Sequence, residues 1–295
     1  MRDFASGCFG DAAVSVAGDS SARGGRQPLL NSVSCFYRAT LASTGKELLV
    51  KVIWHKNNGD ASVAVVVDDG LSSSLFEPIG TNSLLLRKKG SRSFFSAKSI
   101  IVAYWDIAAA KYASGPEPSD DFYLILMADG ELILLLGDKC GDFIKTLSNE
   151  VPVAEFSMYC RKERVLVGAG VQYSTKARFR DGGRDHEVSI VCRGNKCDAG
   201  NAELCICIDK KRLVQVKSIS WNFRGNQIIF VDGSAVDVLW DVHDWWFRES
   251  SGGAVFAFRA RSTTTEISRL WRGDDEELAK GKSHFSLLIQ AFKSA

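Results

Sequence analysis

The alternation of apolar and polar residues in Ser234–Phe247, SAVDVLWDVHDWWF, is the feature that most constrains the fold. Every second residue from Val236 to Val242 is apolar, and the residues between them are polar except Leu239. Successive side chains of an extended chain point to opposite faces, so this pattern predicts a half-buried strand.

A second segment of the same kind, Ser99–Tyr112, stands earlier in the chain. Its Trp105-Asp106 corresponds to Trp240-Asp241, and the strand-like runs and turns around the two segments follow a similar order. Short runs and Asp-Gly turn signals recur throughout, without long helical patterns between them. We therefore predict an all-β protein of two tandem, internally duplicated β-sandwich or barrel-like units.

We expect one short helical turn in each unit. After Asp106 the residues IAAAKY favour a helix, and the aspartate is a predicted N-cap because its carboxylate accepts hydrogen bonds from first-turn N–H groups. The linker is placed where the alternation loosens around Pro152. The predicted boundaries are a disordered tail at 1–30, a first β unit at 31–143, a linker at 144–165 and a second β unit at 166–294.

Charge and composition narrow the classes of partner. The net charge of +2 gives no overall field that favours nucleic acid or an anionic membrane, so no nucleic acid is expected as a partner. The chain start lacks a signal-peptide pattern, and no run approaches the roughly 18 apolar residues of a membrane-spanning helix. We expect a cytoplasmic or nuclear protein whose eight cysteines are reduced thiols.

Several motifs carry a family resemblance. They include Trp105-Asp106 with Gly115-Pro116, Tyr173-Ser-Thr-Lys-Ala-Arg-Phe179 with His186, and Trp221-x-Phe-Arg-Gly-Asn226 with Phe230-Val-Asp-Gly233. With them the chain resembles the plant-specific family called domain of unknown function 868, over nearly its whole length past the N-terminal tail. The resemblance implies a plant protein, and it brings no established activity, cofactor or catalytic residue.

Asp241 and His243 are the weak candidates for catalysis. On a strand they share a face about 7 Å apart, and a carboxylate beside an imidazole can act as an acid–base pair or bind a metal. The corresponding residues of the first half are Asp106 and Ala108, so the imidazole has no counterpart there. Capping of a helical turn by Asp241 is therefore the favoured interpretation.

Alternating cations in the second half are the candidates for anion binding. Lys176, Arg178 and Arg180 point to one face of a predicted strand, with Arg184 beyond it and Lys217 opposite. Such a face can bind phosphate or carboxylate groups, and it can equally be a solvated face or one that protects a sheet edge.

No metal site and no cofactor is predicted. Cys192, Cys197, Cys205 and Cys207 lie close in sequence but lack the paired spacing of structural zinc sites. The phosphate-loop, nucleophile-elbow and zinc-protease motifs are missing from the sequence.

We therefore predict a non-catalytic binding or scaffold module for a protein or an anionic ligand. The alternatives are an enzyme that uses Asp241 and His243, and a module that binds a lipid phosphate or a sugar phosphate.

Overall fold

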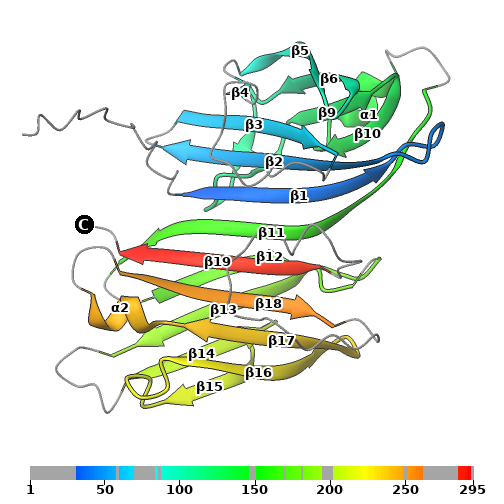
Figure 1. Cartoon of the computed structure of the whole chain (residues 1–295). Coiled ribbons are helices and arrows are strands. Elements are labelled where there is room, and N and C mark those ends of the chain that lie inside the picture. The colour runs from blue at the N-terminus through cyan, green and yellow to red at the C-terminus, as the bar shows by residue number, and fades with distance from the viewer. Residues whose placement is uncertain are drawn as a thin grey trace, which may run out of the picture.

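A computed structural model gives the arrangement of the chain (Figure 1). It describes residues 31–57, 60–69, 84–85, 88–145, 151–168, 171–180, 182–194, 202–248, 252–261 and 285–293. The predicted tail at 1–30 lies outside these residues. The described part consists mostly of strands, with the short helices α1, Cys140–Ile144, and α2, His243–Phe247. The predicted all-β class is confirmed.

A nine-stranded sheet, called the large sheet below, extends through both halves of the chain (Figure 1). Neighbouring strands pair antiparallel, except β11 and β19, which run parallel. The order across the sheet is β16 (Arg224–Val231), β17 (Ser234–Asp241), β18 (Gly253–Ala260), β19 (Ser286–Lys293), β11 (Glu155–Val167), β1 (Ser32–Thr40), β2 (Glu47–Asn57), β3 (Asp60–Asp68) and β4 (Leu84–Leu85).

Two four-stranded sheets accompany the large sheet. The first small sheet has the order β10 (Glu131–Leu136), β9 (Tyr123–Ala128), β6 (Ser99–Asp106) and β5 (Lys89–Ser96). The second small sheet has the order β12 (Val171–Ala177), β13 (His186–Arg193), β14 (Glu203–Ile208) and β15 (Lys211–Lys217). A short ribbon of β7 (Lys111–Tyr112) and β8 (Pro118–Asp120) follows β6.

Both small sheets pack against the same face of the large sheet (Figure 1). Residues that lie opposite each other on paired strands point to the same face. Cys35 on β1 lies opposite Arg161 on β11, which in turn lies opposite Leu287 on β19. Cys35 belongs to the core beneath the first small sheet and Leu287 to the core beneath the second. Arg161 therefore lies at the seam between the two cores.

Each core contains a tryptophan that lies across from a glycine on the neighbouring strand. Gly90 pairs with Trp105, and Gly225 pairs with Trp240. Both indoles are buried, as the alternation of the sequence predicted. A Cβ added at Gly90 would lie 3.2 Å from the Trp105 ring, and one at Gly225 would lie 2.2 Å from the Trp240 ring. Both positions favour glycine because the indole covers the backbone there.

The helical turn predicted after Asp106 is wrong. Residues 108–109 form a turn, and Lys111–Tyr112 then pairs with β8 as strand β7. The Asp106 carboxylate accepts a hydrogen bond from the N–H of Ala108 at 3.0 Å, so it closes this turn and does not begin a helix. Pairing with β8 outweighs the helical propensity of the alanines.

The segment for which we predicted a linker, 144–165, contains most of β11. This strand lies between β1 and β19 near the middle of the large sheet. Its alternation is hard to recognise because Arg161 and Glu163 occupy the inward positions that Val165 and Val167 occupy further along the strand. The large sheet consequently continues without a break through the position of the expected boundary.

Candidate functional site

An open cleft of about 1140 Å³ lies over the seam between the two cores. Its floor includes Tyr37 from β1, with Met158 and Arg161 from β11. The segment Ala113–Ser119 forms one side, from which the Glu117 side chain reaches Arg161 on the floor, and residues between Tyr173 and Arg180 form the other side. The cleft therefore lies where the two halves of the chain meet.

Arg161 is the central charged residue of the floor. Its Nη1 donates to Oε2 of Glu117 at 2.6 Å, and its Nε donates to Oε1 of Glu163 at 2.6 Å. The hydroxyl of Thr175 donates to the same Glu163 oxygen at 2.7 Å. Glu163 is fully buried, whereas Glu117 is 32% exposed and lines the cleft. The cluster thus links the segment before β8 to β11 and β12.

Protonated groups surround this cluster. The Cys35 sulfur lies 3.5 Å from Nη1 of Arg161, and burial, with the nearby charge of Glu117, raises the pKa of the Cys35 thiol to about 12. Burial also raises the pKa of Tyr37 and of Tyr173. All three groups therefore stay neutral near pH 7. The charged members are then one guanidinium and two carboxylates, so the cluster carries one more negative charge than positive.

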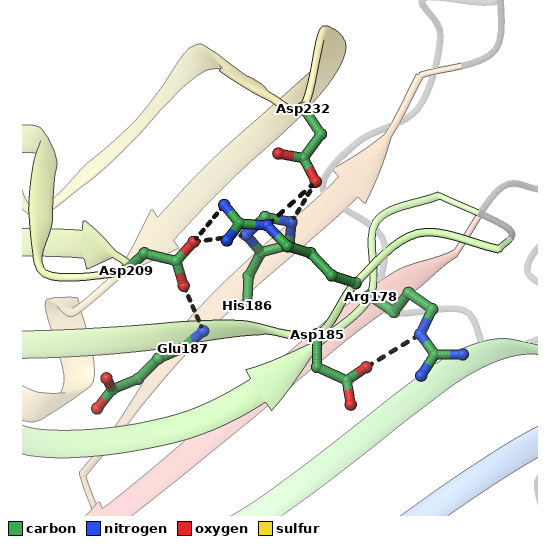
Figure 2. Close-up of polar contacts among 7 residues, drawn as sticks. Arg178, Asp185, His186, Glu187, Asp209 and Asp232 are labelled. Atoms are coloured by element: carbon green, nitrogen blue, oxygen red, sulfur yellow. Dashed lines mark hydrogen bonds and ion pairs between the residues drawn. The ribbon is translucent and has the colours of Figure 1, made fainter.

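The predicted basic residues Lys176, Arg178 and Arg180 all line the cleft on its β12 side. All are exposed, and they alternate with the buried residues Ala177 and Phe179. Arg178 donates from Nε to Asp185 Oδ1 at 3.0 Å (Figure 2). Within the described part of the chain, Lys176 and Arg180 take part in no ion pair. Two cations on this wall are therefore available to a ligand.

The other two predicted anion-binding residues lie away from the cleft. Lys217 ends β15, at the opposite edge of the second small sheet from β12. Arg184 donates from Nη2 to Asp209 Oδ2 at 3.1 Å, and its Nε lies 3.6 Å from Asp232 Oδ2. The fold thus gathers only part of the predicted set at one place.

The side chains of Asp241 and His243 each contact a different neighbouring side chain. Asp241 Oδ2 accepts from Arg224 Nε at 2.7 Å, and its Oδ1 accepts from the backbone N–H of His243 at 3.0 Å. The imidazole Nδ1 of His243 lies 2.9 Å from Asp244 Oδ1. Asp241 thus stabilises the first turn of α2, just before the N-cap position at Val242. This geometry favours a capping role for Asp241 over proton transfer with His243.

A family model described as a plant protein of unknown function, DUF868, matches residues 29–293. The chain belongs to this family. The resemblance found in the sequence motifs is therefore confirmed. A search of curated proteins and a search of solved structures found no match. In the part of the chain that the structure describes, no helix combines the length and apolar character needed to cross a membrane.

A second polar cluster lies at one end of the second half. Figure 2 shows the ring of His186 between two carboxylates, with Nδ1 2.8 Å from Asp209 Oδ2 and Nε2 2.8 Å from Asp232 Oδ2. His186 is buried at the start of β13. Asp209 lies in the turn between β14 and β15, and Asp232 in the turn between β16 and β17. The imidazole therefore connects a turn of the second small sheet to a turn of the large sheet.

The same geometry argues against a metal at His186, because its two ring nitrogens point to different carboxylates and not to one centre. Among the described residues, no group of three or more His, Cys, Asp and Glu side chains is arranged to hold a metal ion. Cys192, Cys205 and Cys207 are free thiols, and Cys197 lies outside the described residues.

The sequence interpretation missed Arg161, Glu163, Glu117 and His186. A signal for the first two was present, because both are in phase with the apolar residues Val165 and Val167 of the same strand. A charged residue at an inward position of a strand needs a buried partner. His186 carried the same signal, since it is in phase with the buried residues Val188 and Ile190 of β13. Glu117 carried none, since a loop segment has no periodicity that indicates its neighbours.

Proposed function

We propose that this protein is a non-catalytic binding module whose cleft takes an anionic ligand on the wall formed by Lys176, Arg178 and Arg180. The observation that carries the proposal is the position of these cations in the cleft, where Lys176 and Arg180 have no ion-pair partner among the described residues. A cation that already has a partner, such as Arg178 beside Asp185, offers a ligand less. Lys176 and Arg180 are therefore the principal contacts.

The shape of the site supports binding of a small molecule. The cleft volume of about 1140 Å³ is slightly larger than the roughly 300–1000 Å³ of small-molecule sites, so the cleft has room for such a ligand. The cleft lies between parts of the chain that are distant in sequence, which is also a common place for such sites. Its wall is built on β12, so the cations are held by a strand and its extension.

The test compares a variant of the wall with a control variant that loses a cation elsewhere on the same sheet. We expect the double variant Lys176→Gln with Arg180→Gln to lose binding of inorganic phosphate and of glucose 6-phosphate, measured by isothermal titration calorimetry at low salt. The control Lys217→Gln, at the opposite edge of the sheet, keeps the affinity of the wild-type protein. Added salt weakens the interaction because the wall is exposed to solvent.

Two results would contradict the proposal. One is that neither probe binds to the wild-type protein at low salt. The other is that the double variant and the Lys217→Gln control bind both probes with the wild-type affinity.

We further infer that the two halves arose by an internal duplication, with each half forming a sandwich. In support, the first four strands of each half are consecutive neighbours in one sheet, namely β1 to β4 and β12 to β15. The later strands are also consecutive neighbours, namely β5, β6, β9 and β10 in the first half and β16 to β19 in the second. The Gly90–Trp105 and Gly225–Trp240 pairs occupy corresponding strands. An experimental structure would overturn the inference if the Gly90–Trp105 and Gly225–Trp240 pairs lay at different positions after superposition of the two halves.

A further inference from the structure

We infer that the cleft selects a sugar monophosphate, a compound with one phosphate and several neighbouring hydroxyl groups. The inference rests on the proposed function, because the phosphate is the group that the wall with Lys176 and Arg180 would bind. It adds a role for the floor, where Glu117 and Arg161 would bind the hydroxyl groups of the sugar.

The floor presents a hydrogen-bond acceptor beside a donor. The Glu117 carboxylate lines the cleft and accepts a hydrogen bond from Arg161 at Oε2. Arg161 uses Nε and Nη1 for its contacts with Glu163, Glu117 and Cys35, and its Nη2 has no hydrogen-bond partner among the described residues. A hydroxyl group both donates and accepts, so a pair of adjacent hydroxyls matches a carboxylate beside a guanidinium.

The charge of the floor decides against a second anionic group. One guanidinium lies between two carboxylates, Glu117 and Glu163, so this cluster has an excess of one negative charge. A phosphate or carboxylate placed there would meet like charges, and taking Arg161 from its partners would leave Glu163 buried without a cation. Neutral hydroxyls avoid both penalties. The ligand therefore carries its charge at the end that meets the wall.

The same floor disfavours a lipid phosphate. An acyl chain over Glu117 and Arg161 would remove charged groups from water without giving them hydrogen bonds, which is unfavourable. The apolar lining residues, among them Val33, Phe156, Met158 and Phe285, can contact the C–H groups of a sugar ring, while Glu117 and Arg161 bind its hydroxyls.

The experiment compares four probes by calorimetry and vesicle sedimentation: glucose 6-phosphate, glucose, inorganic phosphate and vesicles containing phosphatidic acid. We expect the wild-type protein to bind glucose 6-phosphate at least tenfold more tightly than inorganic phosphate, and to remain in the supernatant when the vesicles are sedimented. Glu117→Gln lowers the affinity for glucose 6-phosphate by about tenfold, the usual effect of losing a hydrogen bond to a charged group. In the same variant the preference for glucose 6-phosphate over inorganic phosphate falls accordingly.

Glu203→Gln, on β14, is the control for a general loss of negative charge, and it leaves both affinities unchanged. Because Glu117 also contacts Arg161, melting temperatures are measured for each variant. Glu117→Asp is the second variant, since it keeps the charge beside Arg161 and withdraws the carboxylate by one methylene. The inference is overturned if a Glu117 variant that stays folded binds glucose 6-phosphate with the wild-type affinity.

The outcomes separate this inference from the proposed function. Equal affinity of the wild-type protein for glucose 6-phosphate and inorganic phosphate overturns the role of the floor and leaves the wall as an anion site. Preferential binding to the vesicles also overturns it, in favour of a lipid headgroup. Binding of none of the four probes overturns both proposals.

Discussion

Gly225 lies directly across from Trp240 in the pairing of β16 with β17, and the indole occupies the space that a side chain at Gly225 would need. A Cβ there would lie 2.2 Å from the ring, a distance at which either the indole or the strand must move. The Trp240 ring has little freedom to move, because its Nε1 donates to the carbonyl of Asn222 at 3.0 Å and the ring is buried.

We therefore expect Gly225→Ala to lower the free energy of unfolding by about 1–3 kcal/mol, the range found for overpacked cores. Gly90→Ala has a smaller effect, because the corresponding distance to Trp105 is 3.2 Å. Gly168→Ala is the control, since an added Cβ there meets nothing within 4 Å. Urea unfolding of the three variants measures the difference, and equal losses at Gly225 and Gly168 would contradict the packing argument.

Arg161 neutralises the fully buried Glu163 through a contact of 2.6 Å. We expect Arg161→Met to lower the free energy of unfolding by about 3–5 kcal/mol, because it leaves a buried carboxylate without its cation. Adding Glu163→Leu restores part of the loss, since the charge that lacked a partner is then gone. If the double variant is less stable than Arg161→Met in urea unfolding, desolvation of Glu163 is not the cause of the loss.

The His186 cluster predicts a change of stability with pH. The hydrogen bonds from His186 and from the backbone N–H of Glu187 lower the pKa of Asp209 below its ordinary value of 3.8. A carboxyl group whose pKa is lower in the folded protein contributes stability above its unfolded pKa, and the contribution is lost as the pH falls through the folded-state pKa. We therefore expect the stability of the wild-type protein to fall more steeply than that of Asp209→Asn between about pH 5 and pH 3.

Chemical unfolding at several pH values measures the two slopes. Asp142→Asn serves as the control because the Asp142 side chain is 81% exposed on α1, and its curve runs parallel to that of the wild-type protein. Parallel curves for Asp209→Asn and the wild-type protein would show that the contacts of Asp209 with His186 and Glu187 contribute nothing to stability.

The alternation of the sequence predicted most strands because each has one face in a core, so local periodicity carries the information. It predicted Trp105 and Trp240 as buried for the same reason, and both are. It failed at β11, where the seam between the cores places Arg161 and Glu163 at inward positions. It also failed after Asp106, where pairing of β7 with β8 replaces the expected helical turn.

The candidate site was predictable only in part. Lys176, Arg178 and Arg180 follow the period of one strand, so the sequence placed them on a common face, and the structure puts that face on a cleft. Arg184 and Lys217 are separated from them by turns and by neighbouring strands, whose positions no local pattern specifies.

The sequence by itself determined the all-β class, most strands of each half and the basic face that begins in β12, because these depend on which neighbouring residues are apolar. Only the tertiary structure decided that Arg161 meets Glu117, which is 44 positions away, and that its guanidinium contacts Cys35, which is 126 positions away. Such contacts depend on how the two small sheets meet on the large one. The cleft and its polar floor exist because both cores end at that seam.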